Sequence, residues 1–149
     1  ITKNIFIHRS GILRYWTAQE YGDPDKEVTF WFSFPGEFAN SYFPLRKSAI
    51  THTYTSINRL CNLEIIEARL SRLYQTSLNI NKIARIVLED ALCRKITRET
   101  LLLGSSAEAI YEDLITKEKE LINNIPLKYL ASYIGVTPQE LSQIRRKVH

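Results

Sequence analysis

The sequence contains few of the residues on which several classes of protein depend. It has only two cysteines, Cys61 and Cys93, in 149 residues, so an iron–sulfur cluster held by about four thiolates is excluded. The two cysteines lie far apart without a C-x-x-C spacing, which indicates a reducing compartment and ordinary core thiols. The three histidines, His8, His52 and His149, are scattered and form no H-x-H pair. We therefore predict no metal site and no cofactor, because metal-dependent enzymes cluster such ligands.

Long apolar runs and methionine are missing as well. No run approaches the roughly 18 apolar residues of a membrane-spanning helix, and no signal peptide is present, so we expect a cytoplasmic protein with no membrane partner. The chain begins at Ile1 and contains no methionine, so we expect that an upstream segment is missing. The sequence offers no convincing nucleophile–base pair, carboxylate pair or glycine-rich phosphate loop, and we predict that the protein is not an enzyme.

The composition is that of a globular chain with a modest basic excess. Hydrophobic residues make up 44% of the sequence, and the formal net charge is +4. The length fits one domain or two small modules. The positive charge suits nucleic acid or an acidic surface without deciding between them.

The stretch from Ile125 to Lys147 is predicted to form two short helices with a tight turn between them. Pro126 suits the first turn of a helix, and Gly135 suits its end, because glycine adopts the left-handed conformation without steric cost. Thr137 and Glu140 form a predicted capping box around Pro138, which opens the second helix.

The spacing of small, glycine and aliphatic residues in this stretch is typical of a DNA-binding helix-turn-helix. Ala131 permits close approach of the helices, Gly135 makes the turn, and Leu141 fills the shared core. The alternative is an ordinary helical hairpin with a solvated polar face. The residues expected to contact base edges or phosphates are polar or basic. They are Lys128, Thr137, Gln139, Ser142, Gln143, Arg145, Arg146 and Lys147.

The first part of the chain, to about Ile66, reads as β-structure. Short runs at 5–7, 12–16, 28–34, 48–58 and 63–66 are separated by turns, with no helices between them. From Val28 to Phe34 the residues alternate, so Phe30 and Phe32 should face a core while Thr29 and Ser33 face outward. This order predicts an α+β protein with an N-terminal antiparallel β-roll of the cupin-like jelly-roll kind. The roll is too short to close, so we expect its first strands upstream of Ile1.

A helical period begins at Glu67. A short helix should end near Ser77, and a long helix should run from about Asn79 to Leu103. The long helix carries an apolar stripe predicted to form a dimer seam, while Arg94 and Arg98 are expected on its polar side. The seam residues are Ile80, Ile83, Ala84, Val87 and Ala91. The alternative is a helix that packs only against its own domain.

A further helix is expected from Ser106 to about Glu120. Ser105 and Glu108 are predicted to form its capping box, and Asn123-Asn124 should form the link to the C-terminal stretch. The sequence thus divides into a β-roll effector domain at 1–78, a dimerisation helix at 79–103 and a helix-turn-helix domain at 104–149.

This order resembles the Crp/Fnr-type transcription regulators, the family of the cyclic-AMP receptor protein. The resemblance is carried by three stretches and covers nearly the whole chain. It is closest to the short Crp-like regulators of Bacteroidetes-type bacteria. The matching stretches are Phe6 to Tyr15, Phe34-Pro35-Gly36-Glu37-Phe38 and Tyr129 to Arg145.

The resemblance implies a homodimer that binds double-stranded DNA at a palindromic operator and contacts RNA polymerase. The family's base-reading positions fall on Pro138, Gln139 and Gln143, and glutamine pairs with adenine in the major groove. We therefore expect an operator that differs from the best-known one. The family's wing would follow the second helix, and we expect it to be absent or disordered.

In nucleotide-binding members a glutamate holds the ribose and an arginine followed by Ser and Ala binds the phosphate. Gly36 and Glu37 match the first motif, but Lys47 replaces the arginine, and lysine lacks its planar fork. Arg46 lies one residue earlier and would point to the opposite face of an extended segment. The effector is thus expected to be an unknown small molecule rather than cyclic AMP, and Glu37 is by default a turn cap. The pocket residues would be Gly36, Glu37, Phe38, Arg46, Lys47, Ser48 and Ala49.

Two rival functions remain open on the sequence alone. A metal-dependent cupin enzyme would share the β-roll but needs clustered histidines. A dimerisation or sensor module without DNA binding would leave the basic second helix as a solvated face.

Overall fold

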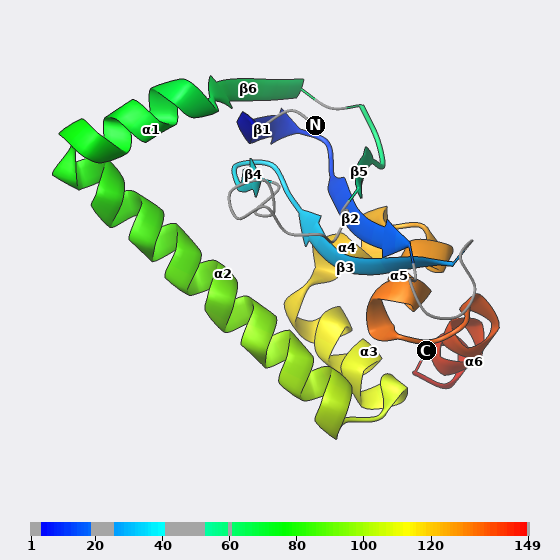
Figure 1. Ribbon diagram of the computed structural model, residues 1–149. Coiled ribbons are helices and arrows are strands. Elements are labelled where there is room, and N and C mark those ends of the chain that lie inside the picture. The colour runs from blue at the N-terminus through cyan, green and yellow to red at the C-terminus, as the bar shows by residue number, and fades with distance from the viewer. Residues whose placement is uncertain (1–3, 19–25, 41–52, 60, 149) are drawn as a thin grey trace. The chain divides into compact units, whose positions relative to one another are not determined.

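The structure, a computed structural model, describes residues 4–18, 26–40, 53–59 and 61–148. The chain divides into two compact units, Ile1–Ala84 and Arg85–His149. The first unit holds the strands and the second holds the C-terminal helices (Figure 1). The division falls inside the long helix α2 (Leu78–Gly104).

Among the residues that the structure describes, the strands form two three-stranded sheets. All of the pairings are antiparallel, as the sequence predicts. In the first sheet both neighbours of the central strand are distant in sequence, whereas in the second sheet one neighbour is the next strand along the chain and the other is distant. The first sheet has the order β4 (Phe38–Asn40), β1 (Asn4–Ser10), β6 (Cys61–Ile66), and the second the order β3 (Glu27–Ser33), β2 (Leu13–Ala18), β5 (Thr53–Ser56). Of the strand expected over 48–58, residues 53–56 are extended, and residues 48–52 lie outside the described residues.

The chain passes from one sheet to the other at Gly11. This glycine has φ 89°, a conformation in which a β-carbon would be strained. The next residue, Ile12, donates its backbone N–H to the Asn58 side chain at 2.8 Å and accepts from the Ile57 N–H at 2.9 Å. These two bonds fix the start of β2 against the segment that follows β5.

The alternation predicted for β3 is only partly correct. Phe32 is buried, as expected, but so are Thr29 and Ser33, which were assigned to the outward face. The pairing of β2 with β3 shifts between Tyr15 and Trp16, and a bulge of this kind changes which side chains share a face.

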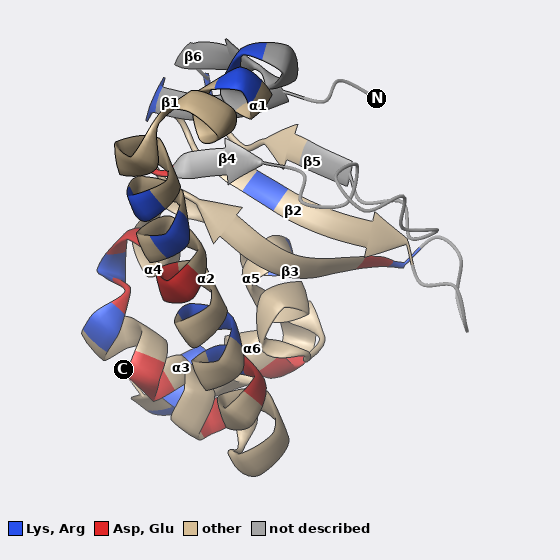
Figure 2. Cartoon of the chain, turned by 60° about the vertical axis from the view of Figure 1, so that its left-hand side comes forward, with Lys and Arg blue, Asp and Glu red and all other residues tan. Residues whose placement is uncertain are grey.

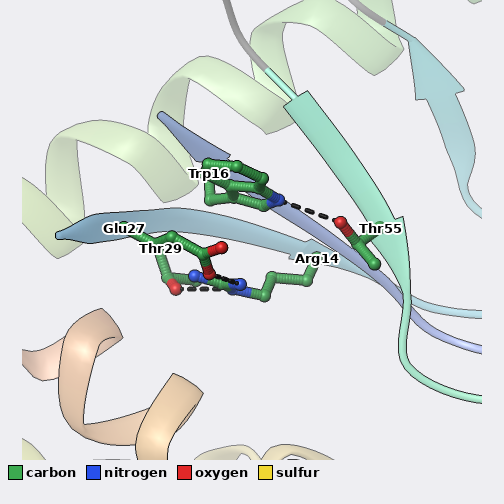
Figure 3. A network of polar contacts seen from close by, with 5 residues as sticks. All are labelled: Arg14, Trp16, Glu27, Thr29 and Thr55. Carbon is green, nitrogen blue, oxygen red and sulfur yellow. Dashed lines mark hydrogen bonds and ion pairs between the residues drawn. The ribbon is translucent and has the colours of Figure 1, made fainter. Parts of the chain in front are cut away.

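Thr29 is buried because it belongs to a polar network on this sheet (Figure 3). The Arg14 side chain, 3% exposed, forms an ion pair with Glu27, and its Nε donates to the Thr29 hydroxyl at 2.8 Å. The guanidinium also lies over the Trp16 ring, whose indole N–H donates to Thr55 at 2.9 Å. A buried cation requires such partners, because desolvation of an isolated charge is costly.

The helices follow the predicted order with three corrections. The short helix α1 and the long helix α2 form where expected. The helix predicted from Ser106 to Glu120 is divided at Glu118 into two, so that Asn123 and Asn124 are helical rather than a link. The helices are α1 (Glu67–Thr76), α2 (Leu78–Gly104), α3 (Ala107–Lys117), α4 (Lys119–Asn124), α5 (Leu127–Ile134) and α6 (Pro138–Val148).

The other two corrections concern helix starts. The N-cap of α3 is Ser106, whose hydroxyl accepts the Ala109 N–H at 3.2 Å, rather than Ser105 in a box with Glu108. Pro126 precedes α5 as its N-cap, with extended ψ of 139°, instead of occupying the first helical position.

The helices α3 to α6 share an apolar core. The helix α3 contacts α4, α5 and α6, and α5 contacts α6. Tyr111, Leu121, Leu130, Ala131 and Leu141 are each at most 1% exposed. This packing holds the last two helices in one arrangement.

Two further observations bear on the sequence predictions. Cys93 is a free and exposed thiol on α2, so the prediction of a core thiol is wrong for this residue. Among the described residues, no helix is both long and apolar enough to cross a membrane.

Candidate nucleic-acid interface

The C-terminal helix pair consists of α5, the turn at 135–137 and α6. Gly135 ends α5 with φ 85°, and the N–H groups of Gly135 and Val136 both donate to the Ala131 carbonyl at 3.0 Å. Ala131 and Leu141 are fully buried. The two predicted helices and their glycine turn are therefore confirmed, with the small and aliphatic residues at the places where the helices meet.

The capping box predicted for α6 is also present. The Glu140 N–H donates to the Thr137 hydroxyl at 3.2 Å, while the Thr137 N–H and hydroxyl donate to the Glu140 carboxylate at 2.7 and 2.8 Å. The hydrogen bonds from Thr137 hold the pKa of Glu140 below its usual value. The Thr137 hydroxyl is thus engaged within the cap, which fixes the first turn of α6.

The exposed face of α6 is polar and positively charged. Gln139, Gln143 and Arg146 follow the spacing i, i+4, i+7, and all three are exposed. At about 100° per residue, they form one line on the side of α6 opposite the buried Leu141. This arrangement directs two amides and a guanidinium away from the core.

The other predicted contact residues flank this line in different ways. Arg145 is exposed, and Ser142 is half-buried. The Lys147 ammonium lies 3.7 Å from the Glu108 carboxylate of α3, and the Lys128 ammonium lies over the Tyr129 ring at 4.6 Å. These two exposed lysines keep their charge close to the helix pair.

The long helix α2 carries apolar residues that the chain itself leaves exposed. Every residue of α2 is described, and none is buried. Figure 2 shows charged residues of both signs interspersed along it. Leu88, Leu92 and Ile96, spaced by four, are 51%, 58% and 54% exposed.

The predicted seam residues lie mostly on a different side of α2. Ile80, Ala84, Val87 and Ala91 are half-buried within the single chain, whereas Ile83 is 50% exposed. The line Leu88–Leu92–Ile96 is turned away from them by roughly 100° at the helical repeat. The structure therefore adds a second apolar line to the predicted one.

The predicted effector pocket is described only in part. Gly36 is exposed with φ 88°, in the turn between β3 and β4. The Glu37 carboxylate accepts the Phe34 N–H at 3.0 Å, and the Glu37 N–H donates to the Phe34 carbonyl at 3.0 Å. Glu37 thus caps this turn, as expected by default. Phe38 begins β4, and Arg46, Lys47, Ser48 and Ala49 lie outside the described residues.

The contact of Arg98 with Tyr133 in the second unit was not predicted from the sequence. Arg98 was placed on the polar side of α2, but it is half-buried and contacts Tyr133 of α5. Arg98 lies four residues after Arg94 and seven residues after Ala91. The helical repeat therefore places it on the same side of α2 as the half-buried Ala91, and this spacing was the available signal. No local rule predicts a partner 35 residues away.

Within the part of the chain that the structure describes, no group of three or more His, Cys, Asp or Glu residues could hold a metal ion. Of the three histidines, His52 and His149 fall outside that part.

Comparison with known proteins gives matches in structure but not in sequence. No protein-family model matches the chain, and no curated relative matches it. Among solved structures, FixK2 from Bradyrhizobium japonicum has a TM-score of 0.80 at 14% identity, covering 99% of this chain and 75% of its own. A CooA variant from Carboxydothermus hydrogenoformans has a TM-score of 0.73 at 15% identity, covering 97% and 66%.

A transcriptional regulator of the CRP family from Thermus thermophilus has a TM-score of 0.72 at 12% identity, covering 98% of this chain and 75% of its own. The matches span the β-structure, α2 and the C-terminal helices, because nearly the whole chain is covered. At these identities the likeness is one of fold. The chain thus has the fold of the Crp/Fnr-type transcription regulators.

Proposed function

We propose that the protein is a DNA-binding transcription regulator of the Crp/Fnr type, in which the C-terminal helix pair is a helix-turn-helix and α6 is the recognition helix. The observation that carries the proposal is the line of Gln139, Gln143 and Arg146 on the side of α6 opposite its buried residue. An α-helix fits the major groove, where glutamine amides pair with adenine and arginine with guanine or a phosphate.

Three further features support this reading. Arg145, Arg146 and Lys147 place positive charge in the last turn of α6, where phosphates flank an inserted helix. The capping box fixes the first turn, so the base-reading residues start from a defined backbone. The fold is that of regulators of transcription.

The proposed regulator acts as a homodimer. The exposed apolar residues of α2 support this, because burying the exposed half of a leucine or isoleucine side chain is worth about 1 kcal/mol. Two copies of one module would read two half-sites about 34 Å apart. The seam would follow the line Leu88–Leu92–Ile96, because Ile83 lies on the opposite side of the helix from Leu92 at 100° per residue. Ile80, Ala84, Val87 and Ala91 are half-buried within the single chain.

The remaining parts of the proposal rest on the resemblance. These are a palindromic operator, a contact with RNA polymerase, a small-molecule effector of the β-roll other than cyclic AMP, and kinship with the short Bacteroidetes-type regulators. Glu37 argues against a ribose contact, because its carboxylate already accepts a backbone N–H in the turn.

Fluorescence anisotropy with a labelled random-sequence duplex in dilute salt tests the proposal. We expect binding that weakens steeply as salt is added, because phosphate contacts release counterions. Selection from a random duplex pool should then recover a palindrome. A protein that ignores every duplex in dilute salt would be a sensor or dimerisation module instead.

A further inference from the structure

The Arg98 side chain of α2 reaches the end of α5. Arg98 Nη2 donates to the backbone carbonyl of Tyr133 at 2.6 Å, and the Arg98 guanidinium carbon lies 4.1 Å from the centre of the Tyr133 ring. Both residues belong to the second compact unit. One guanidinium thus contacts the main chain and the ring of the same residue.

The place of this contact on α5 is favourable for a cation. The last four carbonyls of a helix have no partner within the helix and form the negative end of its dipole. Tyr133 is the second-last residue of α5, and α5 has no basic residue in its own last turn. Arg98 therefore supplies from α2 the positive charge and the donor that the end of α5 lacks.

Both side chains of this contact are partly removed from water. Desolvation lowers the pKa of Arg98, opposed by the neighbouring Tyr133 and Glu118, and desolvation raises the pKa of Tyr133 to about 12. Arg98 remains a cation and Tyr133 remains neutral at physiological pH. A partly desolvated cation is attracted to the face of an aromatic ring more strongly than a fully hydrated one.

An arginine is not the side chain that would stabilise this position most. The buried Arg98 Nε has no hydrogen-bond partner, and a buried donor left without a bond is destabilising. An apolar side chain would fill the same position without that cost. The arginine gains a defined orientation instead, because its planar group must satisfy a carbonyl and a ring together.

Tyr133 lies near the end of α5, so the orientation of its main chain affects where α6 begins. Two residues after Tyr133, Gly135 makes the turn that leads into α6. Fixing the main chain at Tyr133 therefore fixes the point from which α6 departs, relative to α2. In a dimer paired through α2, that relation sets the separation of the two α6 helices.

We propose that Arg98 is a positioning residue that holds the C-terminal helix pair at a fixed angle to α2 through Tyr133. The inference rests on the proposed function where it concerns half-site spacing, but its geometric part does not require DNA. Replacing Arg98 should widen the range of α6 positions without unfolding the helix pair.

Distance measurement between spin labels tests the geometric part. The exposed Cys93 on α2 carries one label and Gln143→Cys on α6 carries the other, in a Cys61→Ser background diluted with unlabelled protein. We expect a narrow distance distribution, and one about twofold broader with Arg98→Gln, because a latch between packed elements is lost. Arg98→Lys keeps the charge but not the planar group and should broaden the distribution as well.

Arg85→Gln is the matched control. Arg85 lies on the same helix as Arg98, but its exposed guanidinium pairs with Glu89 of its own helix at 3.8 Å. The control loses the same charge and should leave the distribution narrow. An unchanged distribution in both Arg98 variants overturns the proposal, and so does equal broadening in the control.

Duplex binding then separates this inference from the proposed function. The probes are the best duplex selected by the unmodified protein and the same duplex with base pairs inserted between its half-sites. Arg98→Gln should bind the original about tenfold more weakly, a change of about 1.4 kcal/mol, and should discriminate less between spacings. Unchanged spacing preference despite broader distances refutes the role in spacing. Absence of all duplex binding refutes the proposed function but leaves the distance result standing.

Discussion

The C-terminal helix pair buries apolar side chains, whereas α2 leaves apolar side chains exposed to solvent. In the pair, Leu130 and Leu141 are 1% and 0% exposed. In α2, Leu92 and Ile96 remain 58% and 54% exposed. The apolar core of the helix pair is thus complete within one chain, whereas α2 leaves apolar surface exposed, which the proposed homodimer would cover.

This contrast separates two sources of stability. The helix pair should depend on its own core and be insensitive to protein concentration. The helix α2 should gain stability from association, and its contribution should rise with concentration by mass action. Substitutions in one region should therefore leave the other region's response unchanged.

The largest effect is expected from Leu141→Ala. Truncating a fully buried leucine leaves a cavity and costs about 2–5 kcal/mol in the free energy of unfolding. Both tryptophans, Trp16 and Trp31, lie in the first unit. In urea, far-ultraviolet circular dichroism should therefore show earlier loss of helix, while tryptophan fluorescence changes little. Lys147→Ala, an exposed change on the same helix, should stay within about 0.5 kcal/mol of the unmodified protein.

Leu92→Lys should weaken association through α2. Two lysines would replace two leucines in the seam, at a cost of about 2–3 kcal/mol, or roughly a hundredfold in the dimer dissociation constant. Analytical ultracentrifugation across a concentration series measures this constant. Glu112→Lys on α3 replaces a carboxylate by an ammonium at an exposed site outside α2 and should leave association unchanged. A dimer equally strong in the Leu92 variant would show that α2 is not the seam.

Gln143→Ala should reduce base discrimination by about 1–3 kcal/mol at one operator position, because a bidentate amide contact is lost. Anisotropy with the selected duplex and single-base variants measures this loss. Gln75→Ala, an exposed glutamine on α1, is the matched control. Equal discrimination in both variants would remove Gln143 from the recognition surface.

Acidification should have the smallest effect and act on the first turn of α6. Glu140 accepts the hydrogen bonds from Thr137 as a carboxylate, so its pKa in the folded protein is lowered from the ordinary value of 4.5. The stabilisation is present above that value and is lost as pH falls through the lowered folded pKa. The protection of the Thr137 and Glu140 amides, measured as their exchange rate relative to that of an unstructured peptide at the same pH, should fall in that window. In Glu140→Gln this protection should not change with pH in the window.

The sequence predicts well where one local rule decides the structure. Gly135, the Thr137–Glu140 box and the buried Leu141 were all found from spacing, because each acts within a few residues. The break at Glu118 was missed, since the apolar period continues through it. Pro126 was placed one residue too far into its helix, because a proline suits both the cap and the first turn.

Contacts between distant residues could not be predicted in the same way. Arg14 lies in an alternating strand pattern, and only the pairing of β2 with β3 reveals that Thr29 and Glu27 surround it. Arg98 is charged, and the sequence pattern assigns it to the polar side of α2. Its burial depends on the packing of α5, which a helical period does not encode.

The most direct measurement of the central claim is a map of backbone amide shifts as a selected duplex is added to labelled protein. The account predicts that the largest changes fall between Thr137 and Arg146, with amides of α2 from Leu88 to Ile96 changing little. Changes confined to other segments, or an unchanged α6 at saturating duplex, would contradict it.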